Sequence, residues 1–256
     1  MSEEIRLAEQ TKPRKKKKRR KKHYFLRFLI LLALCTGLYF FANSEFFDVQ
    51  KIQIEHNTYY TNQQIISISK AKVGENLFKA NVRNMKKNLL SDPYIKSVSI
   101  KKRLPHTLVI TVEERKEAAA IQYGDTYVLI DADGMVLRKT DTEPELTILE
   151  GLTIKSIEPG TPLEVEESYV LTDTLQMLQS MEDNDLYFKK IDISRVMIKA
   201  YIYDYLVCQG TPENLLASME NGDLQAVLYD LYTKDTQRGV ISVGNDSYIS
   251  FSPAIE

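Results

Sequence analysis

Side chains that could carry out catalysis are few in this chain, and they are scattered. His56 and His106 are the two histidines beyond the N-terminal apolar segment described below, and each stands alone in its stretch of sequence. The sequence contains no His-Glu-x-x-His, Gly-x-Ser-x-Gly or Cys-x-x-Cys pattern and no glycine-rich phosphate loop. Carboxylates are plentiful, but the sequence does not pair any two of them for acid–base chemistry. We therefore expect no catalytic residue, no bound metal and no cofactor.

The segment Asp131–Gly134 is one place where a metal site has to be weighed. Its Asp-x-Asp-Gly order is that of the start of a calcium-binding loop, but the rest of such a loop and its distal glutamate are missing. Asp-Gly also supplies the positive φ angle that a tight turn needs. We predict a turn between two strands.

The two cysteines lie in different parts of the sequence relative to the apolar segment. Cys35 lies inside the apolar segment and Cys208 lies well beyond it, so the two cannot pair across a membrane interface. The region after the apolar segment therefore has no internal disulfide, which excludes a disulfide-stapled secreted domain. Cys208 stands in an apolar run, and we predict a small buried residue rather than a nucleophile.

Charge is distributed unevenly along the 256 residues, although the formal net charge is −1. Residues 1–27 carry 12 Lys or Arg against 3 Glu, residues 28–42 carry no charge, and the remainder is acidic. A basic head, an apolar bar and an acidic body exclude a simple cytosolic enzyme.

The apolar bar, Tyr24–Ala42, has 19 residues and a single charge at Arg27. A helix of that length crosses the hydrocarbon core of a bilayer, and the aromatic residues at both ends suit the two interfaces. A cleaved signal peptide is the competing interpretation. Cleavage after Ala42 would place bulky Phe40 where a small side chain is needed. We predict an uncleaved transmembrane helix over residues 24–42.

The basic run before this helix predicts its orientation. Residues 12–22 contain 10 Lys or Arg, and such residues stay on the cytoplasmic side of a span. Residues 1–23 are thus expected to form a disordered cytoplasmic tail that attracts anionic lipid. Nucleic acid is not an expected partner, because no aromatic residue is interleaved with the run. The orienting residues are Lys15, Lys16, Lys17, Lys18, Arg19, Arg20, Lys21 and Lys22.

Residues 46–114 have the pattern of a strand, two helices and two strands. An alternating strand over 49–55 is followed by a capping box, Thr61 with Gln64, at the start of the first helix. Pro93 ends the second helix, because proline cannot continue it. Two alternating strands close this first unit.

Residues 115–252 form a second unit of mixed helices and strands. A hairpin around the Asp131–Gly134 turn opens it, and leucines at helical spacing predict a helix over 167–181. The remaining predicted elements are strands at 190–193, 196–203 and 205–209, helical stretches after Thr211, strands at 239–243 and 248–252, and a tail at 253–256.

The stretch SDPYIKSVSIKKRLPHTLVITVEER combines a proline, an alternating strand ending in arginine, a proline turn and a strand ending in Glu-Arg. These positions are Pro93, Arg103, Pro105, Thr107-Leu108 and Glu114-Arg115. The pattern resembles the end of the POTRA domain of the FtsQ family of bacterial cell-division proteins, called DivIB in Gram-positive bacteria. Gly74–Phe78 also matches the family's Gly-x-Asn-Leu-Phe.

The resemblance continues through the second unit. Lys116-Glu117 stands where family members often have proline, and then Asp131–Gly134, Ile191–Ser194 and Gly210 follow in the family's order. The resemblance covers about residues 12–252. It implies an α+β fold with a transmembrane helix, a POTRA domain (β-α-α-β-β) at 46–114 and a mixed α+β "beta" domain at 115–252.

The resemblance also implies a function. FtsQ and DivIB proteins are non-catalytic, single-pass scaffolds at the division septum that bind FtsL-like and FtsB/DivIC-like bitopic proteins and link division to septal peptidoglycan synthesis. The alternatives are an extracytoplasmic cell-wall enzyme, which needs a nucleophile or metal set, and a membrane-tethered sensor, which needs a larger cytoplasmic domain.

The closing strand region is the expected partner site. A last strand often lies at a sheet edge, where free N–H and C=O groups accept another strand, and the family resemblance points to the same place. Alternation also means that about half of its side chains face the core. The candidate partner-binding residues are Val240, Ile241, Val243, Tyr248, Ile249 and Phe251.

Overall fold

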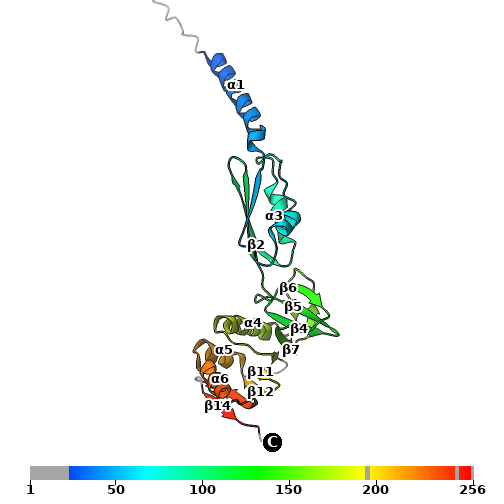
Figure 1. The fold of residues 1–256 in the computed structure, drawn as a ribbon, viewed down its shortest axis with the longest axis vertical. Helices are drawn as coiled ribbons and strands as arrows, with labels where there is room; N and C mark the ends of the chain where they lie inside the picture. Colours follow the sequence, from blue (N-terminus) through cyan, green and yellow to red (C-terminus); the bar gives the residue numbers. More distant parts are fainter. Residues whose placement is uncertain (1–22, 194–196, 246–247, 255–256) are drawn as a thin grey trace, which may run out of the picture.

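The structure is a computed structural model that describes residues 23–193, 197–245 and 248–254. An N-terminal helix, a small domain and a larger domain follow one another along the long axis, and the C-terminus lies at the end away from the helix (Figure 1). The predicted tail residues Lys15 to Lys22 lie outside the described residues.

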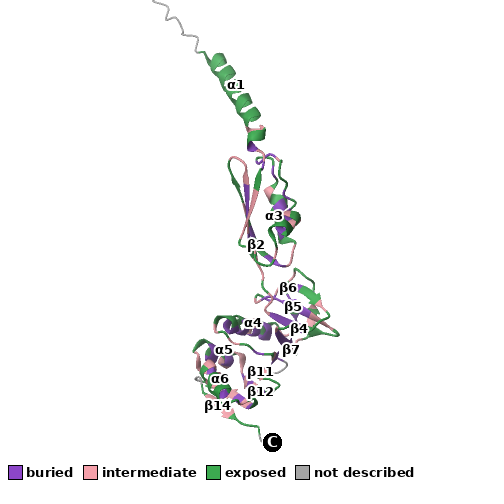
Figure 2. Ribbon diagram, in the orientation of Figure 1, coloured by how far each residue is buried: buried purple, intermediate pink, exposed green. Residues whose placement is uncertain are grey.

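Helix α1, Tyr24–Ala42, projects from the rest of the molecule. It buries none of its 19 residues against protein and is exposed along its length (Figure 2). In the described part of the chain it is the one helix that is long and apolar enough to cross a membrane. Such a surface is stable in hydrocarbon and costly in water, so α1 fits the span of a single-pass membrane protein.

The small domain, called the three-stranded domain below, contains β1, α2, α3, β2 and β3 in chain order. Their bounds are Lys51–Glu55, Asn62–Ser69, Val82–Leu90, Ile95–Arg103 and Thr107–Glu114. The sheet order is β1-β3-β2, with β1 parallel and β2 antiparallel to β3. This confirms the predicted strand-helix-helix-strand-strand order.

Local sequence signals explain the start of α2. The backbone N–H of Gln64 donates to Thr61 Oγ1 at 3.4 Å, and the N–H of Thr61 donates to Gln64 Oε1 at 2.8 Å. The capping box therefore satisfies two donors at the helix start. The helices then bury apolar faces against the sheet, with Ile65 and Leu89 completely inaccessible to solvent.

The larger domain, called the nine-stranded domain below, contains a sheet of order β14-β13-β12-β11-β10-β7-β4-β5-β6 in the described residues. The strands are β4 (Ala119–Tyr123), β5 (Thr126–Ile130), β6 (Val136–Thr140), β7 (Thr147–Glu150), β10 (Lys190–Asp192), β11 (Ile198–Tyr203), β12 (Tyr205–Gly210), β13 (Arg238–Val243) and β14 (Ile249–Ser252). A separate two-stranded ribbon pairs β8 (Ile154–Ser156) with β9 (Glu164–Val165).

Three helices pack on this sheet: α4 (Ser168–Asp183), α5 (Pro212–Glu220) and α6 (Asp223–Thr233). Their apolar faces and the strands form one core, in which Met177, Phe188 and Ile191 are fully buried. Helix α5 begins as expected, with Thr211 as the N-cap and a proline in the first turn. Cys208 is also fully buried there, and burial raises the pKa of its thiol to about 12.

The structure differs from the sequence-based elements at several places. The strands β4, β7, β8 and β9 were not predicted, because they are two to five residues long and too short for a clear alternation. The first strand begins at Lys51 rather than at 49, and the last at Ile249 rather than at 248. Residue 196, the predicted start of the strand at 196–203, lies outside the described residues, and β11 begins at Ile198.

Candidate partner-binding site

Strand β14 forms one end of the large sheet, with β13 as its strand neighbour in the described residues. The two strands are antiparallel and pair Val240 with Ser252, Ile241 with Phe251, and Val243 with Ile249. The predicted edge position of the closing strand is therefore confirmed. The partner site proposed for it still rests on the chemistry of that edge.

The hydrogen-bond pattern shows which backbone groups point away from β13. The N–H of Gly244 donates to Tyr248 O at 2.8 Å, so these two residues form a hydrogen-bonded pair in the ladder. Such pairs alternate with non-hydrogen-bonded pairs in an antiparallel ribbon. Ile249 and Phe251 are then in non-hydrogen-bonded pairs, and their N–H and C=O groups point to the free edge.

The opposite edge of the same sheet is different. At β6, the N–H of Val136 donates to Thr161 O at 3.0 Å, and the N–H of Gly160 donates to Val136 O at 2.8 Å. A neighbouring loop therefore covers the start of β6. The edge at β14 is the more accessible of the two for a new strand.

The six candidate side chains divide between the two faces of the sheet. Ile241 and Val243 are 0% and 4% exposed and lie in the core, so as side chains they cannot contact a partner. This corrects their inclusion in the predicted site, and the reason is the period of two along a strand. The pairing places Ile249 and Phe251 on the same face, where they are partly buried against the core at its rim.

Val240 and Tyr248 lie on the other face by the same alternation. Val240 is partly exposed, and Tyr248 is 69% exposed. Of the six predicted residues, four therefore have side chains or edge groups that an incoming segment could reach.

An open groove of about 530 Å³ runs between β14 and α6. Its apolar part includes Ile249 and Phe251 on one side and Val227 and Leu231 on the other. Asp230 and Lys234 line its polar part, and their side chains form an ion pair at 2.6 Å in the i, i+4 arrangement. The groove lies directly beside the free backbone groups of β14.

Gly239 makes this packing possible. Its φ angle is 141°, and a Cβ atom there would lie 2.5 Å from the ring of Phe251. The absence of a side chain lets the Phe251 ring cross the backbone of β13 and reach the groove. The α6 residues of the groove were missed from the sequence, where their apolar spacing indicated only a core-facing helix.

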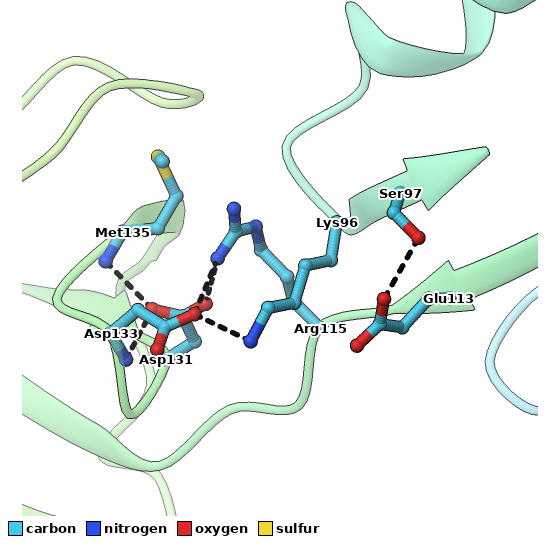
Figure 3. A network of polar contacts seen from close by, with 7 residues as sticks. All are labelled: Lys96, Ser97, Glu113, Arg115, Asp131, Asp133 and Met135. Atoms are coloured by element: carbon cyan, nitrogen blue, oxygen red, sulfur yellow. Dashed lines mark hydrogen bonds and ion pairs between the residues drawn. The ribbon is translucent and has the colours of Figure 1, made fainter.

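The predicted turn at Asp131–Gly134 is confirmed, and its carboxylates bind cations of the protein itself (Figure 3). Asp131 Oδ1 accepts from the N–H groups of Asp133 and Met135, at 3.0 and 2.7 Å. Its other oxygen accepts a hydrogen bond from the guanidinium of Arg115, which also reaches Asp133 at 3.2 Å. The carboxylates of the turn thus bind Arg115, the first residue after β3.

Lys96 adds a contact across the junction between the two domains. It lies on β2, and its Nζ is 2.8 Å from Asp133 Oδ2 (Figure 3). The hydrogen bond from Lys96 lowers the pKa of Asp133 and, conversely, raises that of Lys96. Both domains therefore share this network.

Glu117 makes a second link at the junction. It accepts a hydrogen bond from Tyr94 Oη at 2.5 Å and pairs with Arg138 Nε at 2.9 Å. Tyr94 follows α3, and Arg138 lies on β6, so one carboxylate binds both domains. The carboxylate just after β3 thus connects the two domains.

A metal site requires several ligating side chains close together. Among residues 23–193, 197–245 and 248–254, no group of three or more His, Cys, Asp or Glu side chains is placed to hold a metal ion. The described chemistry of the β14 edge is hydrogen bonding and apolar contact, which suits recognition of a peptide segment.

The chain is similar to known proteins over most of its length. The family model described as "POTRA domain, FtsQ-type" matches residues 47–115, which is the three-stranded domain. DivIB of Clostridium acetobutylicum is 32% identical over 222 residues, covering 86% of this chain and 87% of that protein. DivIB of Clostridium tetani is 30% identical over 157 residues, covering 60% of this chain and 58% of that protein.

A solved structure was also matched. It is the major extracytoplasmic domain of the trans isomer of DivIB from Geobacillus stearothermophilus, with 13% sequence identity and a TM-score of 0.33. The match covers 46% of this chain and 96% of that one.

The molecule is thus of the class that carries one N-terminal apolar helix, an FtsQ-type POTRA domain and a C-terminal β-rich domain. The extent and identity of the match to the Clostridium acetobutylicum protein then decide the family. The chain belongs to the DivIB/FtsQ family of cell division proteins.

Proposed function

We propose that this protein is a non-catalytic scaffold of the division machinery, and that its β14 edge binds the extracytoplasmic segment of an FtsB/DivIC-like partner as an added strand. FtsL-like proteins are the second proposed partner. Family membership supports a role in cell division. The observation that carries the partner site is the free edge of β14 beside an apolar groove.

The mode of binding follows from the edge chemistry. The outward N–H and C=O groups of Ile249 and Phe251 would pair with an incoming strand, which provides affinity but little selectivity. Every second side chain of that strand would enter the groove between β14 and α6, and the others would meet Tyr248. Selectivity would come from those alternate side chains.

The proposed topology places residues 1–23 in the cytoplasm and the domains outside, at the septum. The basic run before α1 supports this orientation, and its charges would also attract anionic lipid. Protease added to intact protoplasts is expected to destroy the domains and spare an N-terminal tag. A protected C-terminus would contradict the topology.

The partner site is tested by charge substitution at the edge. Ile249→Glu in the N-terminally tagged full-length protein should abolish co-purification of the DivIC-like protein from solubilised membranes, because a charge would enter the groove. The matched control is Tyr123→Glu on the β4–β5 hairpin, where the tyrosine is 51% exposed and distant in the sheet order. Co-purification that survives both Ile249→Glu and Phe251→Glu, with the domain folded, would place the site elsewhere.

A further inference from the structure

The end of α1 is capped by the three-stranded domain. The last carbonyl groups of a helix lack partners within the helix. Asn76 Nδ2 donates to Ala42 O at 3.0 Å and to Ser44 O at 3.4 Å, while Asn76 Oδ1 accepts from the N–H of Phe78 at 3.0 Å. Asn76 is 7% exposed. The loop between α2 and α3 is therefore fastened to the membrane helix.

Four aromatic rings strengthen the same junction. Phe41 of α1 contacts Phe46 and Phe47 at centroid distances of 6.0 and 5.2 Å, and Phe47 contacts Phe78 at 5.0 Å. A backbone hydrogen bond joins the same two segments, since the N–H of Leu77 donates to Phe47 O at 2.8 Å. These contacts hold the domain at a defined position relative to α1.

The β2–β3 hairpin tip lies at this end of the domain, beside the end of α1 (Figure 1). The N–H of Gln50 donates to His106 O at 2.9 Å, which places the tip next to the chain leaving α1. Lys102 Nζ donates to Phe78 O at 3.2 Å and joins the tip to the capping loop.

Exposed apolar side chains gather on these loops. Phe46 is 57% exposed, Phe78 is 50% exposed and Leu104, at the hairpin tip, is 58% exposed. They come from three separate segments that the contacts above bring to the level where α1 ends. In water, these three side chains would leave apolar surface exposed at one end of the domain, and the fold of the domain does not require that exposure.

We propose that this end of the three-stranded domain rests on the outer surface of the bilayer, with Phe46, Phe78 and Leu104 inserted at the level of the lipid headgroups. A lipid bilayer is the surface that these side chains meet, because α1 spans that bilayer and the contacts described above hold the loops next to the end of α1. Apolar side chains of surface-bound segments enter the headgroup boundary by roughly 5–10 Å. The inference rests on the proposed span of α1.

Charge makes a smaller contribution than apolar contact here. Lys101, Lys102 and Arg103 precede Leu104 at the tip and suit anionic headgroups. Glu45 and Glu75 lie on the neighbouring segments and oppose that attraction. The docking is therefore expected to persist on neutral lipid and to strengthen modestly when anionic lipid is added.

The absence of tryptophan from the sequence permits a direct test. Phe78→Trp and Leu104→Trp each introduce a single reporter into the full-length protein, reconstituted in nanodiscs of phosphatidylcholine with brominated acyl chains. Leu31→Trp, in the middle of α1, is the positive control. Tyr232→Trp, on α6 and 72% exposed, is the matched control away from the membrane.

Bromine quenching of both reporters should approach that of Leu31→Trp and clearly exceed that of Tyr232→Trp. A second set of discs containing phosphatidylglycerol should increase it slightly. If Leu31→Trp is quenched and both loop reporters behave like Tyr232→Trp, the docking proposal is overturned and the span stands. If Leu31→Trp itself is not quenched, the proposed span fails and the docking proposal with it.

Discussion

The three-stranded domain is held at both of its ends, whereas the nine-stranded domain ends in β14, whose one strand neighbour in the described residues is β13. At one end Asn76 and four phenylalanine rings fasten the three-stranded domain to α1. At the other, Arg115 and Glu117 fasten it to the nine-stranded domain. Strand β14 pairs with β13, and a groove between β14 and α6 lies beside it.

The two regions therefore differ in what they are suited to do: the three-stranded domain positions its neighbours, and the β14 edge is suited to recognition of another chain. Contacts at both ends of the three-stranded domain hold the nine-stranded domain at a defined position relative to α1. A free edge is a liability in a protein that has no use for it, because it pairs with other chains. The β14 edge lies at the end of the molecule away from α1 (Figure 1).

The largest expected effect tests whether β13 and β14 differ in burial on the face that they share. Ile241→Glu places a charge in the core and should lower the free energy of unfolding by about 4 kcal/mol or more. Ile249→Glu, at the rim of the core, should cost only about 1 kcal/mol. Thermal unfolding of the two full-length variants measures the contrast. Equal losses would show that Ile249 is a core residue and would remove it from the proposed edge site.

The next effect concerns the domain junction. Arg115→Ala leaves Asp131 without its cation, and the two side chains are 13% and 6% exposed. Removing one partner of such a buried pair should cost roughly 3 kcal/mol. Lys96→Ala, whose side chain is 43% exposed, should cost less than about 1 kcal/mol. Denaturant unfolding of both variants provides the comparison, and a larger loss for Lys96→Ala would reverse the assignment of the main contact.

A smaller effect is expected at Glu117, the second link at the junction. Glu117→Ala removes hydrogen bonds from Tyr94 and Arg138 and should cost about 1–2 kcal/mol. Its neighbour provides a control, because Lys116 is 82% exposed and its ion pair with Glu182 is 3.5 Å long. Lys116→Ala should therefore be nearly neutral. Small-angle scattering should show a wider range of domain orientations for Glu117→Ala alone.

Acid should destabilise the protein by a modest amount, through one carboxylate at this junction and one inside the three-stranded domain. Lys96 lowers the pKa of Asp133. At Glu114, burial acts to raise the pKa, but hydrogen bonds from the N–H groups of Thr58, Tyr59 and Tyr60 outweigh it and lower the pKa. Groups with depressed pKa stabilise the fold above their unfolded values of about 4, and this stability is lost as the pH falls through their folded values.

Unfolding measured from neutral pH down to about pH 3 should show this loss. The Asp133→Asn variant should lose less stability over that interval than the unsubstituted protein, since it lacks one of the titrating groups. An identical pH dependence for the two proteins would show that the Asp133 ion pair contributes nothing to the junction.

Several elements could be predicted because the signals that specify them are local. The Thr61 capping box, the Asp131–Gly134 turn and the apolar run of α1 each depend on neighbouring residues alone. The family resemblance rested on similar short patterns and led to the correct family. Short strands such as β7 could not be predicted, because their pairing with β4 and β10 joins distant parts of the chain.

The sequence by itself determined the long apolar helix α1, the strand-helix-helix-strand-strand order of the three-stranded domain and the presence of a closing strand, predicted at 248–252 and found at Ile249–Ser252. Tertiary structure alone decided that Ile241 and Val243 are buried in the core while Ile249 and Phe251, on the same face, lie at its rim and line the groove, since it places β13 inside the sheet and β14 at its edge. It also decided that Asn76 caps α1 and that Arg115 binds Asp131. Those contacts cross 34 and 16 residues of chain, and only the packing of helices and sheets brings their atoms together.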